Sequence, residues 1–215
     1  MDESLLLSLN GAHTPALDKL MWWISQSTNA LWLTIYALLL IAIVWLYWGQ
    51  RTSSYSKSSS VRSWLPLIGA LVAIAIAVGL ADYISSGILK PMVGRLRPTH
   101  EPALEGMLHV VNNYRGGTYG FPSSHAANTM AVTLIAWLLC SVHRYRSVGH
   151  TLLRPFINGA GIALLLIYVV PNCLSRIYLG VHYPTDILAG LLIGALTALI
   201  AFGMFKLLLR KILIY

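Results

Sequence analysis

The chain has 215 residues, of which 57% are hydrophobic and only 10% are charged. Soluble domains carry about a quarter charged residues, so this composition excludes an ordinary water-soluble protein and predicts one that spans a membrane. The formal net charge of +8 suggests a nucleic-acid partner, but the basic residues stand singly between apolar runs and form no basic face or tail. We therefore expect no nucleic-acid binding, and the length suits a single domain over residues 1–215.

The N-terminal segment, residues 1–28, differs from the rest of the chain. Thr14 followed by Pro15 is typical of a helix start. Apolar residues then recur at helical spacing, namely Leu17, Leu20, Met21 and Ile24. This pattern predicts a short helix that either lies in the membrane interface or packs on the rest of the protein.

Five later stretches are long and apolar enough to cross the ~30 Å hydrocarbon core of a bilayer as helices. They run over residues 30–48, 64–84, 124–142, 156–171 and 184–209. The fourth is the shortest, because Pro171 and Asn172 interrupt it. The sequence therefore predicts an all-α, multi-spanning membrane helical bundle.

Basic residues predict the orientation of this bundle. Five spans place three basic groups on one side: Arg51, Lys57 and Arg62; Arg144, Arg146 and Arg154; and Lys206, Arg210 and Lys211. Cytoplasmic loops carry an excess of Lys and Arg, so we expect this side, with the C-terminus, to be cytoplasmic. The N-terminus and the segments 90–123 and 174–183 then face outside. The outer side also carries cations, which need another explanation: Lys19, Lys90, Arg95, Arg97, Arg115 and Arg176.

Three short segments at the outer ends of the spans hold most of the outward-facing polar residues. They are residues 90–98, 121–125 and 175–186. Lys90, Arg97 and Arg176 place three positive charges there, and arginine is well shaped for two-pronged binding of phosphate oxygens. Ser123 and Ser124 begin the third span, where free backbone N–H groups and the helix dipole favour an anion. Together these residues predict a phosphate-binding site.

Two histidines predict the chemistry at that site. His182 and Asp186 are four residues apart around Pro184, which suits the first turn of the fifth span. A carboxylate at that spacing reaches one imidazole nitrogen, fixes the tautomer and leaves the other nitrogen free to attack phosphorus. His125 is then placed to give a proton to the leaving oxygen and to take one from the attacking water. We expect phosphoryl transfer through a phosphohistidine, with three cationic side chains in place of a metal and no cofactor.

This combination of motifs resembles the type 2 phosphatidic acid phosphatase (PAP2) superfamily, which shares its site with the vanadium haloperoxidases. The family pattern has three parts. Lysine, six residues and Arg-Pro match residues 90–98, and Ser-Arg, five residues, His, three residues and Asp match residues 175–186. The part that lies between these two in the chain, Pro-Ser-Gly-His, matches residues 122–125, with Ser124 in place of the usual glycine.

The resemblance implies a haloperoxidase-like core of six helices with the motifs on loops at one end. We therefore expect five to six transmembrane helices, a short interfacial N-terminal helix, and residues 99–120 as an outer loop over the site. The resemblance also implies phosphate ligands at Lys90, Arg97, Ser123, Ser124 and Arg176, and catalytic roles for His125, His182 and Asp186. The haloperoxidase branch itself is soluble, which five apolar spans argue against.

The substrate that the resemblance implies is a lipid phosphate within the membrane. Small bacterial proteins of this family act on undecaprenyl pyrophosphate, phosphatidylglycerol phosphate or the phosphates of lipid A. An outward site on the cytoplasmic (inner) membrane suits undecaprenyl pyrophosphate and lipid A equally, and family frequency favours undecaprenyl pyrophosphate. The alternative of another class is a non-enzymatic membrane protein that binds or transports anions. It is disfavoured because a binder needs no oriented nucleophile at His182 and no second histidine. No protein partner is evident.

Overall fold

The computed structural model describes residues 1–26, 36, 41, 65–144, 159 and 161–214. This part of the chain is nearly all helical, and its β-type pairing is limited to an isolated antiparallel bridge between Leu96 and Tyr119. The predicted all-α class is therefore confirmed for the described residues. The first predicted span, residues 30–48, lies outside them except for two positions.

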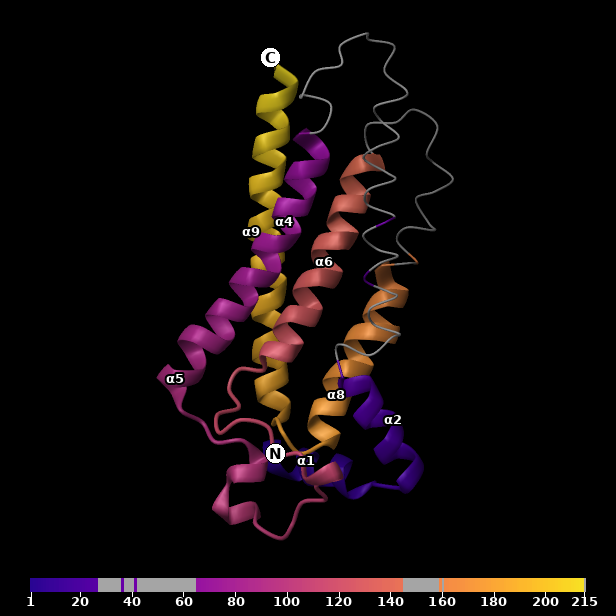
Figure 1. Cartoon of the computed structure of the whole chain (residues 1–215), viewed down its shortest axis with the longest axis vertical. Coiled ribbons are helices and arrows are strands. Elements are labelled where there is room, and N and C mark those ends of the chain that lie inside the picture. Colours follow the sequence, from indigo (N-terminus) through magenta and orange to yellow (C-terminus); the bar gives the residue numbers. More distant parts are fainter. Residues whose placement is uncertain (27–35, 37–40, 42–64, 145–158, 160, 215) are drawn as a thin grey trace.

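Three long helices form the bundle: α4 (Leu65–Asp82), α6 (Ser124–Arg144) and α9 (Pro184–Ile214). Each packs against the other two, and Figure 1 shows them side by side along the long axis of the molecule. Small alanine side chains let the helix backbones approach closely. The buried residues of this shared core include Ala70, Ala73, Ala77, Ile135, Leu139, Ala198 and Ala201. The third and fifth predicted spans are thus confirmed as helices.

The helix of the second predicted span is longer than expected. It continues from α4 through a π-helical stretch, η2 (Tyr83–Leu89), into the short helix α5 (Lys90–Val93). Gly94, with a φ of +61°, ends it in the left-handed region that favours glycine. The prediction that this helix ends at residue 84 is therefore wrong. Within this stretch the Ser85 hydroxyl is satisfied by the helix itself, because its Oγ donates to the Ala81 carbonyl oxygen at 2.7 Å.

The helix of the fourth predicted span also runs further than expected. A π-helical turn, η7 (Leu165–Val169), leads into α8 (Val170–Tyr178), so the prediction that the span ends at Pro171 is wrong. Proline lacks a backbone N–H, and its ring crowds the carbonyl four residues earlier. The wide turn directly before Pro171 relieves this crowding, since the ladder there already runs from the Val170 N–H to the Leu165 carbonyl.

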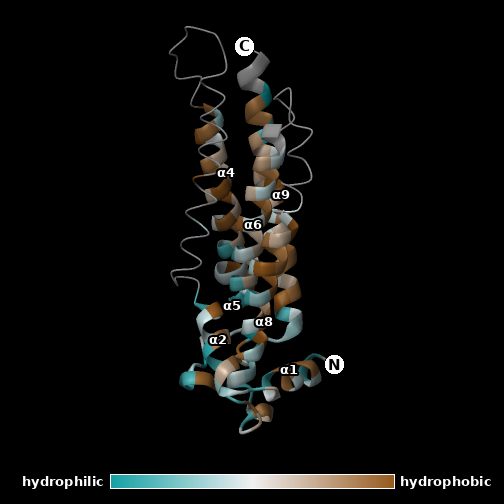
Figure 2. Ribbon diagram, turned by 90° about the vertical axis from the view of Figure 1, so that its right-hand side faces the viewer, coloured by the Kyte–Doolittle hydropathy of each residue, from teal (hydrophilic) through white to brown (hydrophobic). Residues whose placement is uncertain are grey.

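Three helices of the described part are long and apolar enough to cross a membrane: Leu65–Val93, Gly161–Tyr178 and Pro184–Arg210. Figure 2 shows hydrophobic residues over most of α4 and α9, and more hydrophilic ones toward the end that holds α1, α2 and α5. The helix α6 is not among the three, and it buries polar side chains such as Thr129 and Thr133 within the bundle. The chain is therefore membrane-embedded, and the number of five to six spans stays a prediction.

Two helices precede the bundle: α1 (Asp2–Gly11) and α2 (Pro15–Ser25). Thr14 caps α2, its Oγ1 accepting a hydrogen bond from the Leu17 N–H at 3.2 Å, so the predicted helix start is confirmed. Both helices contact α8, and α1 also contacts α9. Their place in the membrane interface stays a prediction.

A buried side chain of α1 ties this helix to the bundle. The Nδ2 of Asn10 donates to the carbonyl oxygens of His109 and Tyr178 at 2.9 and 2.7 Å, and its Oδ1 accepts from the His109 N–H at 2.8 Å. A buried amide with three satisfied hydrogen bonds fixes the position of its helix. The N-terminus therefore lies at the same end of the bundle as α5, and the C-terminus lies at the other end (Figure 1).

The segment between α5 and α6 contains three single 3-10 turns: η3 (Pro98–His100), η4 (Pro102–Leu104) and η5 (Val111–Asn113). It folds back on its own start. The N–H of Arg97 donates to the Thr118 carbonyl oxygen at 3.0 Å. The N–H of Gly120 donates to the Arg95 carbonyl oxygen at 2.8 Å. This closure places residues 114–120 beside the start of the loop.

Candidate active site

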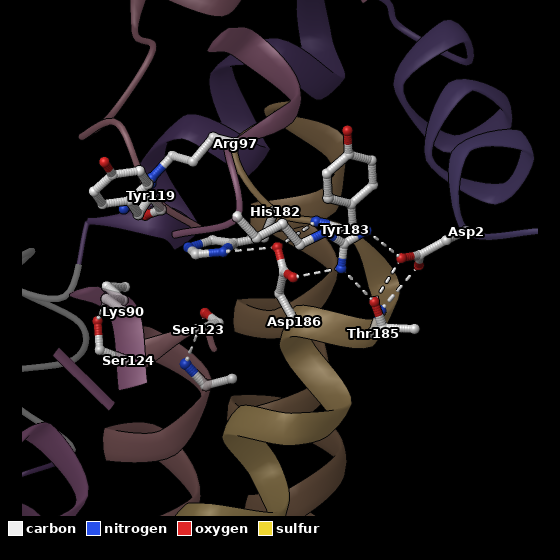
Figure 3. A network of polar contacts seen from close by, with 12 residues as sticks. Asp2, Lys90, Arg97, Tyr119, Ser123, Ser124, His182, Tyr183, Thr185 and Asp186 are labelled. Atoms are coloured by element: carbon white, nitrogen blue, oxygen red, sulfur yellow. Dashed lines mark hydrogen bonds and ion pairs between the residues drawn. The ribbon is translucent and has the colours of Figure 1, made fainter. Parts of the chain in front are cut away.

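The three polar segments meet at the end of the bundle that holds the N-terminus. Lys90 Nζ donates to Ser124 Oγ at 2.8 Å, which joins the first segment to the second. The N–H of Ser123 donates to the Asp186 carbonyl oxygen at 2.9 Å, which joins the second segment to the third. Residues that lie up to about a hundred positions apart are thus brought to one place, as Figure 3 shows for Lys90, Ser123, Ser124 and Asp186.

Two arginines of the motifs are buried, with 8% of Arg97 and 6% of Arg176 exposed. Protein groups hold part of each guanidinium. Arg97 Nε donates to the Tyr119 carbonyl oxygen at 3.1 Å, while Arg176 donates to the Tyr114 hydroxyl at 3.2 Å and to the Ser25 hydroxyl. One buried nitrogen of each, Nη1 of Arg97 and Nε of Arg176, has no hydrogen-bond partner within the described structure. Buried donors of this kind are costly unless an acceptor binds them, so they fit an anion.

The loop approaches Arg97 closely at a glycine. Gly116 has a φ of +67°, and a Cβ at this position would lie 2.4 Å from Nη1 of Arg97. No side chain fits there without displacing the guanidinium. The loop segment 99–120 therefore contacts Arg97 at Gly116, near its C-terminal end, and its place as an outer loop over the site stays a prediction.

The second segment begins helix α6. Ser123 is fully buried, and its Oγ accepts a hydrogen bond from the Ala126 N–H at 3.4 Å, in the position of a helix cap. The first-turn N–H groups of α6 and the positive end of its dipole favour negative charge. Ser124 adds a hydroxyl that already accepts from Lys90, so the residue that replaces the usual glycine takes part in the polar network.

His182 and Asp186 lie at the start of helix α9, and both side chains are buried. Nδ1 of His182 is 3.5 Å from Oδ2 of Asp186, longer than a hydrogen bond but within ion-pair distance. The same Oδ2 accepts from the Tyr183 N–H at 2.9 Å. Asp186 is the third residue of α9, and its side chain thus caps the start of its own helix, as in a capping box. Figure 3 shows one edge of the His182 ring turned to Asp186, while the ring extends toward the side where Lys90 and Ser124 lie.

The environment keeps the His182 imidazole neutral. Burial lowers the pKa of His182 well below its usual range, and the positive charges of Arg176, Arg97 and Lys90 lower it further. A neutral imidazole has the lone pair that a nucleophile needs.

His125 has a partner that the sequence did not indicate. Its Nε2 lies 3.2 Å from Oδ1 of Asn172. The Nδ2 of Asn172 donates to the Tyr168 carbonyl oxygen at 2.8 Å, so the amide oxygen is the atom that faces the histidine. This contact places the proton of the neutral ring on Nε2 and the lone pair on Nδ1.

Sequence reasoning missed several residues at the site, namely Asp2, Ser25, Arg95, Tyr114 and Asn172. Asn172 was read only as an interruption of a span. The sequence does contain a signal for Arg95, because it is one of the cations on the outer side, where the usual orientation bias disfavours Lys and Arg. No local pattern marks the others.

Comparisons with known proteins agree with this geometry. The PAP2 superfamily profile matches residues 66–210. A lipid A 4'-phosphatase from Bacteroides thetaiotaomicron is 31% identical over 90% of this chain and 72% of its own length. A lipid A 4'-phosphatase from Porphyromonas gingivalis is 30% identical over 90% of this chain and 68% of its own.

The fold also has a solved counterpart. A transmembrane PAP2 type phosphatidylglycerolphosphate phosphatase from Bacillus subtilis superposes with a TM-score of 0.54, at 21% identity, over 95% of this chain and 84% of that one. The sequence and fold together define a membrane-embedded lipid phosphatase, an enzyme that hydrolyses phosphate esters. The chain belongs to the PAP2 superfamily, as its motifs predicted.

Proposed function

We propose that this enzyme removes a phosphate monoester from lipid A or a closely related phosphorylated glycolipid, through a phosphohistidine. The observation that carries the chemistry is a pair of buried guanidinium nitrogens, on Arg97 and Arg176, that have no hydrogen-bond partner among the described residues, together with the buried His182. Two fixed cations and a neutral imidazole in one dry site suit an in-line attack on a phosphate dianion.

Each residue then has one role. The phosphate oxygens bind to Lys90, Arg97, Arg176 and the start of α6 at Ser123 and Ser124. Nε2 of His182 attacks phosphorus, the phosphorus–oxygen bond to the lipid breaks, and His125 gives a proton to the leaving oxygen. Burial and the charge of Arg176 lower the pKa of His125 to about 4, so the ring takes up this proton when the phosphate dianion, which offsets the arginine charges, binds beside it. Water next attacks the phosphohistidine and passes a proton to His125, so that inorganic phosphate leaves and His182 returns to its neutral state. Asp186 stabilises the positive charge that develops on His182.

Lipid A is favoured as the substrate by the two relatives that align with 90% of the chain. Undecaprenyl pyrophosphate was the first choice from the sequence, on family frequency alone, and stays an untested prediction. Phosphatidylglycerol phosphate is the third substrate to compare. We further propose that residues 1–215 act as one domain in the inner membrane, with the site outside and no obligate protein partner. The clustering of Lys206 and Arg210 near the C-terminal end of α9, opposite the site, supports this orientation.

A substrate panel tests the proposal. Purified protein in one detergent, with chelator present, is given lipid A, undecaprenyl pyrophosphate and phosphatidylglycerol phosphate, and phosphate release is measured with mass analysis of each product. We expect the highest kcat/KM with lipid A and the loss of one phosphate. Faster turnover of undecaprenyl pyrophosphate overturns the substrate assignment, and complete dependence on added divalent metal overturns the mechanism.

Two variants test the nucleophile. His182→Ala is expected to abolish turnover, whereas Gly117→Ala, in a loop position where a Cβ meets nothing within 4 Å, keeps it. A fully active His182→Ala enzyme contradicts the assignment. Rapid quenching in an alkaline denaturant, followed by detection of alkali-stable and acid-labile phosphate on the wild-type protein but not on His182→Ala, identifies the phosphohistidine directly.

A further inference from the structure

A salt bridge through Arg95, at a position that the family pattern leaves open, joins the N-terminal helix to the candidate nucleophile pair. Arg95 lies between two carboxylates: its Nη2 is 2.7 Å from Oδ2 of Asp2, and its Nη1 is 2.9 Å from Oδ1 of Asp186. Its guanidinium also stacks on the ring of Tyr183, 3.9 Å from the ring centre. Arginine is the side chain that can bind two carboxylates at once in fixed geometry.

The same carboxylate of Asp2 binds the first turn of α9. Its Oδ1 accepts from the Thr185 N–H at 3.0 Å, and its Oδ2 accepts from the Thr185 hydroxyl at 2.5 Å. Arg95 Nη1 in turn donates to that hydroxyl at 2.7 Å. Asp2 therefore caps α9 from another helix, which satisfies a backbone N–H that has no partner within α9. Figure 3 shows Asp2 and Thr185 on the side of Asp186 that faces away from His182.

The two oxygens of Asp186 have separate partners. Oδ1 binds Arg95, while Oδ2 faces the imidazole of His182. Arg95 thus fixes the rotation of the carboxylate, but its positive charge, taken alone, cancels the negative charge that His182 requires from Asp186. Asp2 offsets this charge, so that the three groups together keep one net negative charge beside His182.

We propose that Arg95 and Asp2 are positioning residues for the nucleophile, with Arg95 orienting the carboxylate of Asp186 and Asp2 balancing the charge of Arg95. This inference rests on the proposed roles of His182 and Asp186. Neither Arg95 nor Asp2 needs to touch the substrate, since the phosphate lies on the opposite side of the imidazole.

The protonation states agree with this arrangement. Burial alone would raise the pKa of Asp2, but hydrogen bonds from Thr185 and Arg95 hold it below its usual range. Burial alone would lower the pKa of Arg95, but Asp2 and Asp186 raise it. Both groups are therefore charged at neutral pH. The other groups that act on His182 are all basic, and they oppose the negative charge supplied by Asp186: Arg176, Arg97, Lys90 and His125.

Asp2→Asn and Arg95→Gln test the proposal because they change the charge beside His182 in opposite directions. Each is expected to lower kcat about tenfold with little change in KM. The acidic limb of the pH profile of kcat/KM reports the nucleophile of the free enzyme. It should move about half a pH unit down in Asp2→Asn and about half a unit up in Arg95→Gln. The double variant should lose less activity than the product of the two single losses.

Two further variants separate charge from geometry. Arg95→Lys keeps the charge but not the two-pronged fork, so its pH profile should return toward wild type while kcat stays low. Glu3→Gln removes an exposed carboxylate from the same turn of α1 and should leave both kcat and the profile unchanged. If Asp2→Asn or Arg95→Gln fails to fold, Asp2→Ser and Arg95→Met take their place with the same readouts, because they change the charge beside His182 in the same two directions.

The outcomes that refute the inference are distinct from those that refute the proposed function. Shifts of the pH profile in the same direction, or an unchanged profile in both variants, overturn the positioning role while an inactive His182→Ala enzyme leaves the nucleophile in place. An active His182→Ala enzyme overturns both. A loss of melting temperature with an unchanged profile assigns Asp2 and Arg95 to stability alone.

Discussion

Gly190 of helix α9 lies directly against the start of helix α6. A Cβ added to Gly190 would lie 2.3 Å from the carbonyl oxygen of Ser123, whereas ordinary contacts begin at 3.4 Å. This neighbour is backbone and cannot rotate away, so Gly190→Ala must separate the two helices by about 1 Å. The displaced residue, Ser123, is a predicted phosphate ligand. The substitution therefore acts on both stability and catalysis.

Gly203 provides a matched control on the same helix, because a Cβ there meets nothing within 4 Å. Gly→Ala gains about 1 kcal/mol of helix propensity at either position. Gly203→Ala should show this gain, while overpacking at Gly190 should leave a net loss of about 1–3 kcal/mol. A misplacement of about 1 Å at a catalytic group costs about a hundredfold in rate, so Gly190→Ala should have about 1% of wild-type kcat.

Thermal unfolding in detergent and phosphate release measure the two effects on the same samples. Gly190→Ala should melt several degrees lower than wild type, with a loss of about 2–4 °C per kcal/mol for a chain of this size. If Gly190→Ala is as stable and as active as Gly203→Ala, the close contact between α6 and α9 is wrong, and with it the proposed anchoring of the phosphate site.

Three further predictions concern the site. Gly120→Ala should lower kcat about tenfold, because a Cβ there would lie 3.0 Å from Oδ2 of Asp186. Gly117→Ala, where a Cβ meets nothing within 4 Å, should keep wild-type activity. Equal activities of the two variants contradict the contact between Gly120 and Asp186. Asn172→Leu should lower kcat about tenfold or more, since it removes the acceptor that fixes the tautomer of the proton donor, and an unchanged pH profile would count against this role. The melting temperature should fall as the pH drops below about 6.5, because His182 takes up a proton in the unfolded chain but stays neutral when it is buried in the folded protein. A His182→Asn variant should show a shallower fall, and equal slopes would place the effect elsewhere.

The motif residues could be predicted from the sequence because their spacing is local. His182 and Asp186 are four positions apart, which is about one turn of helix, and the helix begins between them at Pro184. The sequence also placed Lys90 and Ser124 at the outer ends of two spans, but their hydrogen bond is known only from the structure. In these cases, helix geometry and membrane thickness decide the outcome.

The errors have a common cause. The sequence predicts the end of one span at Pro171 and of another at residue 84, but at both places the helix continues through a π-helical stretch. Such turns add one residue without a sequence signature of their own. Lys90 follows the first of them directly, so the added residue changes the direction in which its side chain leaves the helix.

The missed residues depend on distant contacts rather than on local patterns. Asp2 and Ser25 reach the site only because α1 and α2 pack against helices formed more than a hundred residues later. Periodicity describes the face of one helix and contains no information about the partner of that face. Contacts of this kind need the tertiary structure.

The bond between Asp2 and Thr185 joins residues that are 183 positions apart. During biosynthesis this link forms only after nearly the whole chain has left the ribosome and the last helix has entered the bilayer. A chain in which α9 has not yet joined the bundle lacks this cap and does not hold His182 and Asp186 beside the phosphate ligands of the other segments, so we expect it to be inactive. Catalytic competence thus coincides with the completion of membrane insertion, and phosphate release becomes a reporter of assembly.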